Sequence, residues 1–278
     1  MDNLFLKISD FFAFHNVGIS AVPFEKCRII NERKRANCRI QQIESVITLY
    51  VPYSIIPNKT SNISVYARPK DYHLFFSRFF SQACDFLKSL FPDHSFTGYA
   101  DNSFIDERHA AVISGLGVYG KNGTVITKEY GSYVFLGEIV TDLPFSFLKP
   151  LLKNKNMSFD TCIECGACIS VCPMKKGEIQ ECLSSVTQKK GELSVGELNA
   201  MKKYGTVWGC DICQNVCPMN KGKKTSTVPF FNTDVIERLT KEDIEAMSDD
   251  DFSKRAFAWR GRKIILRNLE LIEDNKND

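Results

Sequence analysis

A dense block of cysteines constrains this chain more than any other feature of its sequence. Eight of the 11 cysteines lie between residues 162 and 217 of the 278-residue chain. The segment "CIECGACISVCP" (162–173) spaces four cysteines by two, two and three residues and places a proline after the last one. The segment "GCDICQNVCP" (209–218) has the same ending but only three cysteines. In a reducing compartment, cysteines at such spacings indicate metal binding rather than disulfide bonds.

The spacings predict two [4Fe–4S] clusters that exchange one ligand each. In the bacterial ferredoxin pattern, three closely spaced thiolates bind one cube, and the fourth, which precedes a proline, binds the other cube. The same exchange assigns Cys217 to the first cube and leaves Cys182 as the missing ligand of the second. A Cys₄ zinc site, the alternative, requires neither the cysteine–proline endings nor a second matching group. We therefore predict one cube bound by Cys162, Cys165, Cys168 and Cys217 and another bound by Cys172, Cys182, Cys210 and Cys213.

Two clusters in series predict a path for electrons, and such a path requires a redox centre at its far end. The loop "SGLGVYGKNG" (114–123) contains Gly115, Gly117 and Gly120 at the spacing of a dinucleotide fingerprint. No strand is predicted directly before it, and strand-like "TVIT" stands where the fingerprint requires a helix. We therefore do not expect a nicotinamide site there. The loop is either a tight turn or a backbone that lies close to a flat cofactor.

The rest of the sequence predicts an α+β fold. Amphipathic periodicity predicts helices at 2–15, 71–90 and 104–114, and β-branched runs predict strands at 17–22 and 45–51. Two further strands are expected around a turn at Gly131. A change to Pro, Lys and Asn at 142–158 predicts a boundary. We expect a mixed α/β domain at 1–150, a ferredoxin-like domain at 151–232 and a helical segment at 233–278.

Composition limits the partners and the compartment. A net charge of +3 does not by itself indicate a nucleic-acid partner. No apolar run reaches the roughly 20 residues that span a bilayer, and the first residues do not match a signal peptide because acids and bases interrupt them. We therefore expect a cytoplasmic protein with no membrane partner. Cys27, Cys38 and Cys84 stand apart from the block and are interpreted as buried or incidental thiols.

Asp101 is the candidate catalytic residue. In "GYADNSFIDER" (98–108) it sits where a predicted strand gives way to a predicted helix, a place where carboxylates often line a cleft. Asp106, Glu107 and Arg108 follow closely. A helix cap or a surface ion pair is the alternative, and the residues alone favour it. The four histidines show no metal-ligand spacing.

Taken in order, these motifs resemble those of the epoxyqueuosine reductases. The resemblance covers residues 30–270 and rests on "YARPKDYH" (66–73), "YADNSFIDERHAAVISGLGVYGKNGTVIT" (99–127), "GSYVFLGEIVTD" (131–142), "CIECGACISVCP", "ECLSSVTQKKGEL" (181–193) and "GCDICQNVCPMNKG" (209–222). The family is similar to the reductive dehalogenases in its cobalamin domain and paired clusters. Those enzymes are therefore the nearest competing identity.

The resemblance implies a cytoplasmic oxidoreductase that reduces epoxyqueuosine to queuosine in the anticodon wobble position of tRNA. It implies a cobalamin-binding α/β domain and two [4Fe–4S] clusters that pass electrons to a cobalamin without a protein ligand on its cobalt. It also implies that Asp101 is the proton donor, because opening an epoxide generates an alkoxide that needs a positioned acid. Asp211 is expected to bring its cluster close to the cobalamin. The implied cobalamin contacts are Arg33, Ser64, Asp101, Val125, Leu136, Ser184, Lys190 and Asp211.

The resemblance also sets the expected partners. We expect a monomer that takes queuosine-type tRNA as substrate and receives electrons from an external donor such as ferredoxin or flavodoxin. Longer members continue into HEAT-like repeats that help to hold tRNA, and this chain resembles a short form without them. The basic tail residues are expected either to contact phosphates or to form a solvated helix; they are Lys254, Arg255, Arg260, Arg262, Lys263 and Arg267.

Two other functions stay open at this point. The same machinery could reduce a small epoxide or an organohalide instead of tRNA. Alternatively, the cysteine block could be a ferredoxin-like electron carrier joined to an unrelated α/β domain. That carrier would contain iron and sulfide but no corrinoid.

Overall fold

Two runs of β-branched residues form the centre of a four-stranded sheet in the computed structural model, which describes residues 2–53, 61–152 and 161–273. The strand order is β1 (Gly18–Pro23), β2 (Ser45–Pro52), β6 (Val134–Thr141) and β3 (Phe96–Tyr99). All three neighbouring pairs are antiparallel. Every residue of β2 is buried. The predicted strands at 17–22 and 45–51 are therefore confirmed, with small shifts at their ends.

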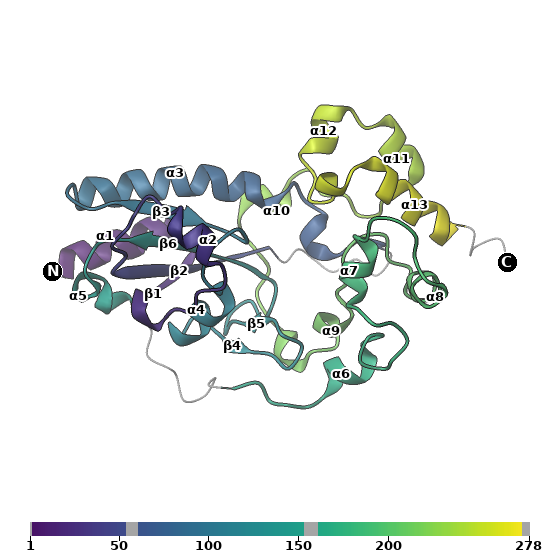
Figure 1. Cartoon of the computed structure of the whole chain (residues 1–278), viewed down its shortest axis with the longest axis horizontal. Helices are drawn as coiled ribbons and strands as arrows, with labels where there is room; N and C mark the ends of the chain where they lie inside the picture. Colours follow the sequence, from purple (N-terminus) through teal and green to yellow (C-terminus); the bar gives the residue numbers. More distant parts are fainter. Residues whose placement is uncertain (1, 54–60, 153–160, 274–278) are drawn as a thin grey trace. The chain divides into compact units, whose positions relative to one another are not determined.

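Helices cover both faces of this sheet, as Figure 1 shows for α3 (Tyr72–Leu90) and α4 (Glu107–Ile113). Side chains alternate between the two faces along a strand. On β6, Gly137 lies against the Phe76 ring of α3, because a Cβ atom at Gly137 would lie 3.1 Å from that ring. The neighbouring positions 136 and 138 therefore face α4. The helix α1 (Asp2–Phe14) completes the predicted helices of this half, and α3 buries Phe76, Phe79, Ala83 and Leu87.

The glycine-rich loop forms a small hairpin. Its strands are β4 (Val118–Tyr119) and β5 (Val125–Ile126), which pair with each other. A Cβ atom at Gly117 would lie 2.6 Å from the Ile126 carbonyl oxygen, which is too close for any other residue. The glycine at 117 is thus required by the packing of the hairpin, and no helix follows it as a dinucleotide fingerprint would require. Short helices complete this part of the chain, namely η1 (Phe24–Lys26), α2 (Glu32–Ala36), α5 (Phe145–Leu148) and η3 (Lys149–Leu151).

The chain divides into two compact units, and the division is not a single cut. The first unit is Met1–Pro52 with His73–Glu164, and the second is Tyr53–Tyr72 with Cys165–Asp278. The second unit thus takes in a segment from within the predicted first domain. The predicted boundary region at 142–158 falls partly outside the described residues, so the division at 150 and 232 stays a prediction.

The second unit is built from short helices. In its described residues no regular strand occurs, although Ile63 and Trp208 form an isolated bridge. The segment Val65–Ala67 forms η2. The helices are α6 (Ala167–Val171), α7 (Leu183–Thr187), α8 (Val195–Tyr204), α9 (Ile212–Asn215), η5 (Pro218–Asn220), α10 (Pro229–Asn232), α11 (Lys241–Ala246), α12 (Asp249–Ser253), η6 (Ala258–Arg260) and α13 (Arg262–Glu273).

One apolar core holds the C-terminal helices to the inserted segment. Trp208 and Phe257 are fully buried in it, together with Ile63 from the inserted segment and Leu269 from α13. Thr240 caps α11, because its hydroxyl accepts from the backbone N–H of Asp243 at the start of that helix. Among the described residues, no helix is both long enough and apolar enough to cross a membrane.

Candidate functional site

The cysteines of the second unit lie in or beside three short helices. Cys168 lies in α6 and Cys172 ends it, Cys182 precedes α7, and Cys213 lies in α9. The helices α6 and α9 pack against each other, so the two cysteine motifs meet in space. No disulfide bond is assigned to any cysteine of the described residues. The division between the units falls after Glu164, so that Cys162 belongs to the first unit and the other seven predicted ligands belong to the second.

Three cysteines predicted to bind one cube act on one another electrostatically. Burial raises the pKa of the Cys210 thiol to about 12, and the charges of Cys182, Asp211 and Cys213 add to this shift. Such an electrostatic effect requires short separations. Cys182 is 28 residues before Cys210 in the sequence, and its charge nevertheless acts on the Cys210 thiol, as does that of Cys213.

The cysteine spacing, rather than a convergence of side chains, supports the prediction of cubes. Within the described residues, no three His, Cys, Asp or Glu side chains converge as the ligands of one metal ion would. A cube binds each thiolate through a different iron, so its four sulfurs are spread farther apart than the ligands of one zinc ion. The assignment of individual cysteines to two cubes stays a prediction.

The loop of the first cysteine motif has an unusual backbone. Glu164 and Gly166 both adopt left-handed conformations, with φ values of 51° and 74°. Alternation of backbone hand brings successive N–H groups to one side of a loop and favours the binding of anions. A sulfide-containing cluster with thiolate ligands is anionic, and this loop suits it.

Asp211 ties the second cysteine motif to the inserted segment. Its carboxylate accepts hydrogen bonds from the Ser64 hydroxyl at 2.5 Å and from the backbone N–H of Val65 at 2.7 Å. Burial raises the pKa of Asp211, while these hydrogen bonds act in the opposite direction. Next to it, Gly209 has a φ of 72°, and a Cβ atom there would lie 2.5 Å from Cβ of Ser64. Two residues predicted to contact cobalamin therefore contact each other.

The other predicted cobalamin contacts occupy several elements. Val125 and Leu136 belong to one apolar cluster of the first unit. Arg33 is exposed on α2. In the second unit, Ser184 lies in α7 and accepts from the Gln188 amide at 3.3 Å, and Lys190 is exposed. Four of the eight contacts, including Asp101, thus fall in the first unit and four in the second.

Asp101 lies on the loop between β3 and α4, as the sequence predicts. Its backbone is left-handed with a φ of 59°, which is strained for a residue with a Cβ atom. Its side chain is 56% exposed, and Oδ2 lies 3.9 Å from Nε2 of His73. The interpretation of Asp101 as a helix cap is wrong, because Asp106 caps α4 by accepting from the His109 N–H at 3.1 Å. Capping therefore does not explain an aspartate at position 101.

Comparisons with known proteins identify both halves of the site. A family described as "Epoxyqueuosine reductase QueG, DUF1730" matches residues 33–102, and a "4Fe-4S double cluster binding domain" matches residues 161–220. An epoxyqueuosine reductase from Staphylococcus aureus is 32% identical over 281 residues, which cover 93% of this chain and 70% of that protein. The chain belongs to the epoxyqueuosine reductase family. Its enzyme class is oxidoreductase, and its cysteine region is a double-cluster domain.

Solved structures of epoxyqueuosine reductases share this fold. The structure from Streptococcus thermophilus has a TM-score of 0.76 and 23% identity, and the match covers 99% of this chain and 82% of that one. A structure with an epoxyqueuosine-modified tRNA-Tyr stem loop has a TM-score of 0.77 and 22% identity, with the same coverage of both chains. The mixed α/β architecture is therefore that of the family.

Sequence reasoning missed one pair of buried acids in the first unit. Glu138 on β6 is fully buried, and Glu107 at the start of α4 lies beside it. Burial raises the pKa of Glu107 to about 8, and the nearby Asp101 adds to this shift. The available signal was the single acid in the apolar run "VFLGEIV" (134–140), because a charged residue at a buried strand position needs a partner.

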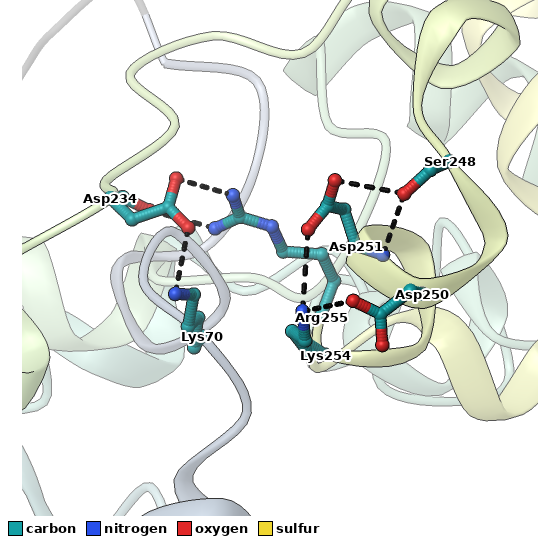
Figure 2. Close-up of polar contacts among 7 residues, drawn as sticks. All are labelled: Lys70, Asp234, Ser248, Asp250, Asp251, Lys254 and Arg255. Carbon is teal, nitrogen blue, oxygen red and sulfur yellow. Dashed lines mark hydrogen bonds and ion pairs between the residues drawn. The ribbon is translucent and has the colours of Figure 1, made fainter.

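The basic tail does not form a continuous cationic face. Lys254 pairs with Asp250 and Asp251, and Arg255 is buried and pairs with Asp234, as Figure 2 shows. Lys70 of the inserted segment also pairs with Asp234. These charges are neutralised within the unit.

Two other arginines of the tail hold neighbouring backbone. Arg262 donates to the Ile244 and Met247 carbonyl oxygens and pairs with Asp249. Arg267 donates to the carbonyl oxygens of Lys189 and Gly191. Arg260, which stacks 3.8 Å from the Trp259 ring centroid, and the exposed Lys263 are left as candidates for contacting phosphates.

Proposed function

We propose that this chain reduces epoxyqueuosine to queuosine in the wobble position of tRNA. One observation supports the proposal most strongly. Both functional regions, the one with the candidate acid and the one with the cysteine motifs, match family models. The reductase match at 33–102 includes Asp101, and the double-cluster match at 161–220 includes all eight predicted ligands. The Staphylococcus aureus relative is named for the same activity.

Cobalamin and two [4Fe–4S] clusters are the cofactors of this proposal. Cys162, Cys165, Cys168 and Cys217 would hold one cluster, and Cys172, Cys182, Cys210 and Cys213 would hold the other. The cobalamin would contact Ser64, Val125, Leu136, Ser184, Lys190 and Asp211, with Arg33 as a further contact. When bound, these groups supply low-potential electrons to the epoxide carbon.

The role of Asp101 follows from the charge that the reaction develops. Loss of the epoxide oxygen as water requires a pair of electrons and a pair of protons. Opening the ring places negative charge on that oxygen, and a neutral carboxyl group within hydrogen-bond reach stabilises it by donating a proton. The exposed side chain of Asp101, held on a left-handed turn, is the proposed donor.

The proposed substrate is a tRNA with a queuosine-type anticodon. One fold relative has been solved with an epoxyqueuosine-modified tRNA stem loop, which supports this assignment. An external donor such as ferredoxin or flavodoxin would provide electrons to a monomeric, cytoplasmic enzyme. A small epoxide or an organohalide is the second candidate substrate class, since most of the basic tail residues are engaged within their own unit. An electron carrier is disfavoured, because the reductase match includes Asp101.

Anaerobic reconstitution tests the proposal. The full chain would be loaded with iron, sulfide and cobalamin, and metal analysis should give about eight irons and one cobalt per chain. The reconstituted protein would then be incubated with a reductant and epoxyqueuosine-containing tRNA, and the nucleosides would be measured by mass spectrometry. Formation of queuosine supports the proposal. Full loading with turnover of small epoxides but not of tRNA would overturn the substrate, and iron without cobalamin would indicate an electron carrier.

A further inference from the structure

The second cube is predicted to take its ligands from separate segments of the chain, namely Cys172, Cys182, Cys210 and Cys213. Cys182 directly precedes α7, whereas Cys210 and Cys213 follow it by 28 and 31 residues, at the entry to α9 and within it. The helix α7 has only five residues, and a helix of that length is not stable by itself in water. Contacts from elsewhere in the second unit must therefore hold α7 in place.

Asn268 of α13 contacts both segments. Its exposed fraction is 0%, and its side-chain amide donates to the Thr187 carbonyl oxygen at 2.7 Å and to the Val207 carbonyl oxygen at 2.9 Å. Thr187 is the last residue of α7, and the last carbonyl groups of a helix have no partner within it. Val207 lies three residues before Cys210. One buried side chain thus joins the end of α7 to the chain that enters the second cysteine motif.

The Thr187 hydroxyl forms a second link between the same segments. It accepts from the backbone N–H of Gly209 at 3.0 Å and donates to the Ser184 carbonyl oxygen at 2.8 Å. Gly209 immediately precedes Cys210, and its backbone is left-handed with a φ of 72°. This link therefore fixes the backbone at the residue before a predicted ligand.

Arg267 extends these contacts to the turn that follows α7. Its Nη1 donates to the carbonyl oxygens of Lys189 at 3.1 Å and of Gly191 at 2.7 Å. Its Nε and Nη2 donate to Oδ1 of Asn268 at 3.1 and 2.9 Å. The side-chain amide of Asn268 thus uses both its donor and its acceptor atoms, which fixes its orientation.

The destination of these bonds distinguishes Asn268 and Arg267 from ordinary buried polar groups. The carbonyl groups to which the two side chains donate all lie between residues 187 and 207, in the chain that connects predicted ligands of the second cube. Arg262, on the same helix, also donates to two carbonyl groups, but these belong to Ile244 and Met247 of the C-terminal segment. One helix therefore makes similar bonds to a cysteine segment and to a segment without cysteines.

We propose that two residues of α13, Asn268 and Arg267, assemble the site of the second cube by holding α7 against the segment 207–213. They are positioning residues, because they bond to the backbone near the ligands. The proposal rests on the cluster cofactors of the proposed function and is independent of the substrate. The double-cluster match ends at residue 220, so the second cube depends on a helix outside that match.

The iron content of the reconstituted full chain tests this role without substrate or cobalamin. The wild type should contain about eight irons. Asn268→Leu removes both amide donors at similar side-chain volume, and we expect about four irons, because only the first cube keeps its site. Full iron content in a folded Asn268→Leu variant would overturn the proposal.

Arg267→Gln keeps the proposal testable if the buried substitution prevents folding, because Arg267 is only half-buried. We expect complete loading, but about four of the irons should leave for a chelator about 10–100-fold faster than in the wild type, the usual cost of losing a group that supports a ligand. Wild-type release in Arg267→Gln would overturn its role.

Two further variants separate positioning from a general loss of stability. Arg262→Gln removes the arginine that makes similar bonds elsewhere, and Ile244→Ala removes a buried side chain of α11 from the C-terminal core. Both should keep about eight irons and release them at the wild-type rate, even where urea unfolding shows as much destabilisation as in Asn268→Leu. Iron loss that follows stability across all the variants would indicate a general structural role and overturn the proposal.

Combination with Cys182→Ser identifies the affected cube. Cys182→Ser alone should keep the about four irons of the first cube. Adding Asn268→Leu should remove no more iron, and adding Arg267→Gln should not speed the release of the remaining iron, because both changes act on the cube that is already lost. A further loss or a faster release would show that α13 supports both cubes and would overturn the assignment to the second.

Failure of the proposed function would give a different result. A wild-type chain without iron would overturn the cluster cofactors and this role with them. A wild type that binds about eight irons but forms no queuosine would overturn the proposed reaction alone. The iron contents of the variants would then still decide whether Asn268 and Arg267 assemble the second cube.

Discussion

The cysteine region and the sheet region of this molecule hold their chemistry in different ways. In the first motif, the ligands are spaced by two or three residues, so the chain itself fixes which groups can reach one cube. In the sheet region, Glu107 and Glu138 come from a helix and a strand that are joined by a hairpin. Metal chemistry can therefore be recognised from local spacing, whereas the buried acids are recognised only from their packing.

Loss of one cluster ligand is the strongest test of the cysteine region. In Cys182→Ser, we expect the iron content to fall from about eight to about four per chain and turnover to be lost, because the second cube lacks a thiolate. Iron analysis and electron paramagnetic resonance would measure this. Cys84→Ser is the matched control, because Cys84 lies on α3 and burial raises the pKa of its thiol to about 11. Full iron content in Cys182→Ser would remove Cys182 from the ligand set.

Asp101→Asn tests whether the sheet region provides the acid. We expect normal iron and cobalamin loading but a turnover loss of about 10²–10⁴-fold, since an amide does not replace a general acid. Asp85→Asn, at an exposed position of α3, is the control. Single-turnover kinetics at several pH values would provide the measurement. Wild-type turnover in Asp101→Asn would exclude Asp101 as the donor.

Asp211→Ala tests the hydrogen bonds between the cysteine motif and the inserted segment. The Ser64 hydroxyl and the Val65 N–H would be left without their buried acceptor, at a cost on the order of 3 kcal/mol in the free energy of unfolding. Urea unfolding of the full chain would measure this cost. Asp243→Ala removes an exposed capping carboxylate and should cost about 1 kcal/mol or less. Equal effects in the two variants would show that Asp211 adds no special stability.

Glu138→Gln tests the buried acids through the pH dependence of stability. A folded-state pKa that is raised above the unfolded value gives stability that is present at acid pH and is lost as the pH rises. The free energy of unfolding of the wild type should therefore fall between pH 4.5, the ordinary pKa of a glutamate, and the folded-state pKa of about 8 for Glu107. In Glu138→Gln this fall should be smaller by on the order of 2 kcal/mol. Parallel pH profiles for the two proteins would contradict the raised pKa of Glu138.

The smallest expected effect is on tRNA binding and concerns Arg260 and Lys263. Replacing both with glutamine should weaken tRNA binding several-fold and reduce its salt dependence, because binding releases about one counterion for each phosphate that the protein neutralises. Lys254→Gln is the matched control, since Lys254 is already paired with Asp250 and Asp251. Binding would be measured at several salt concentrations. An equal reduction in the control would show that pairing does not determine which basic residues bind RNA.

Sequence predicted the elements of the sheet and the cysteine motifs well for a physical reason. Strands such as β2 are continuous apolar runs, and ligand spacing reflects the size of one cluster. The buried pair was not predicted, because periodicity does not reveal which helix covers Glu138. The sequence left the basic tail open between phosphate contacts and a solvated helix, because Asp234 and Asp250, which pair with Arg255 and Lys254, are not recognisable as partners in the sequence.

The inserted segment Tyr53–Tyr72 has a consequence for how the chain is made. Asn62 bonds to Leu239, which follows it by 177 residues, and Ser64 bonds to Asp211, which follows it by 147 residues. During synthesis, this segment leaves the ribosome long before either partner exists. The second unit therefore completes its core only when nearly the whole chain has been translated, and contacts of such long range slow folding. A ribosome stalled before residue 239 would carry the segment without its final partners, open to chaperones and proteases.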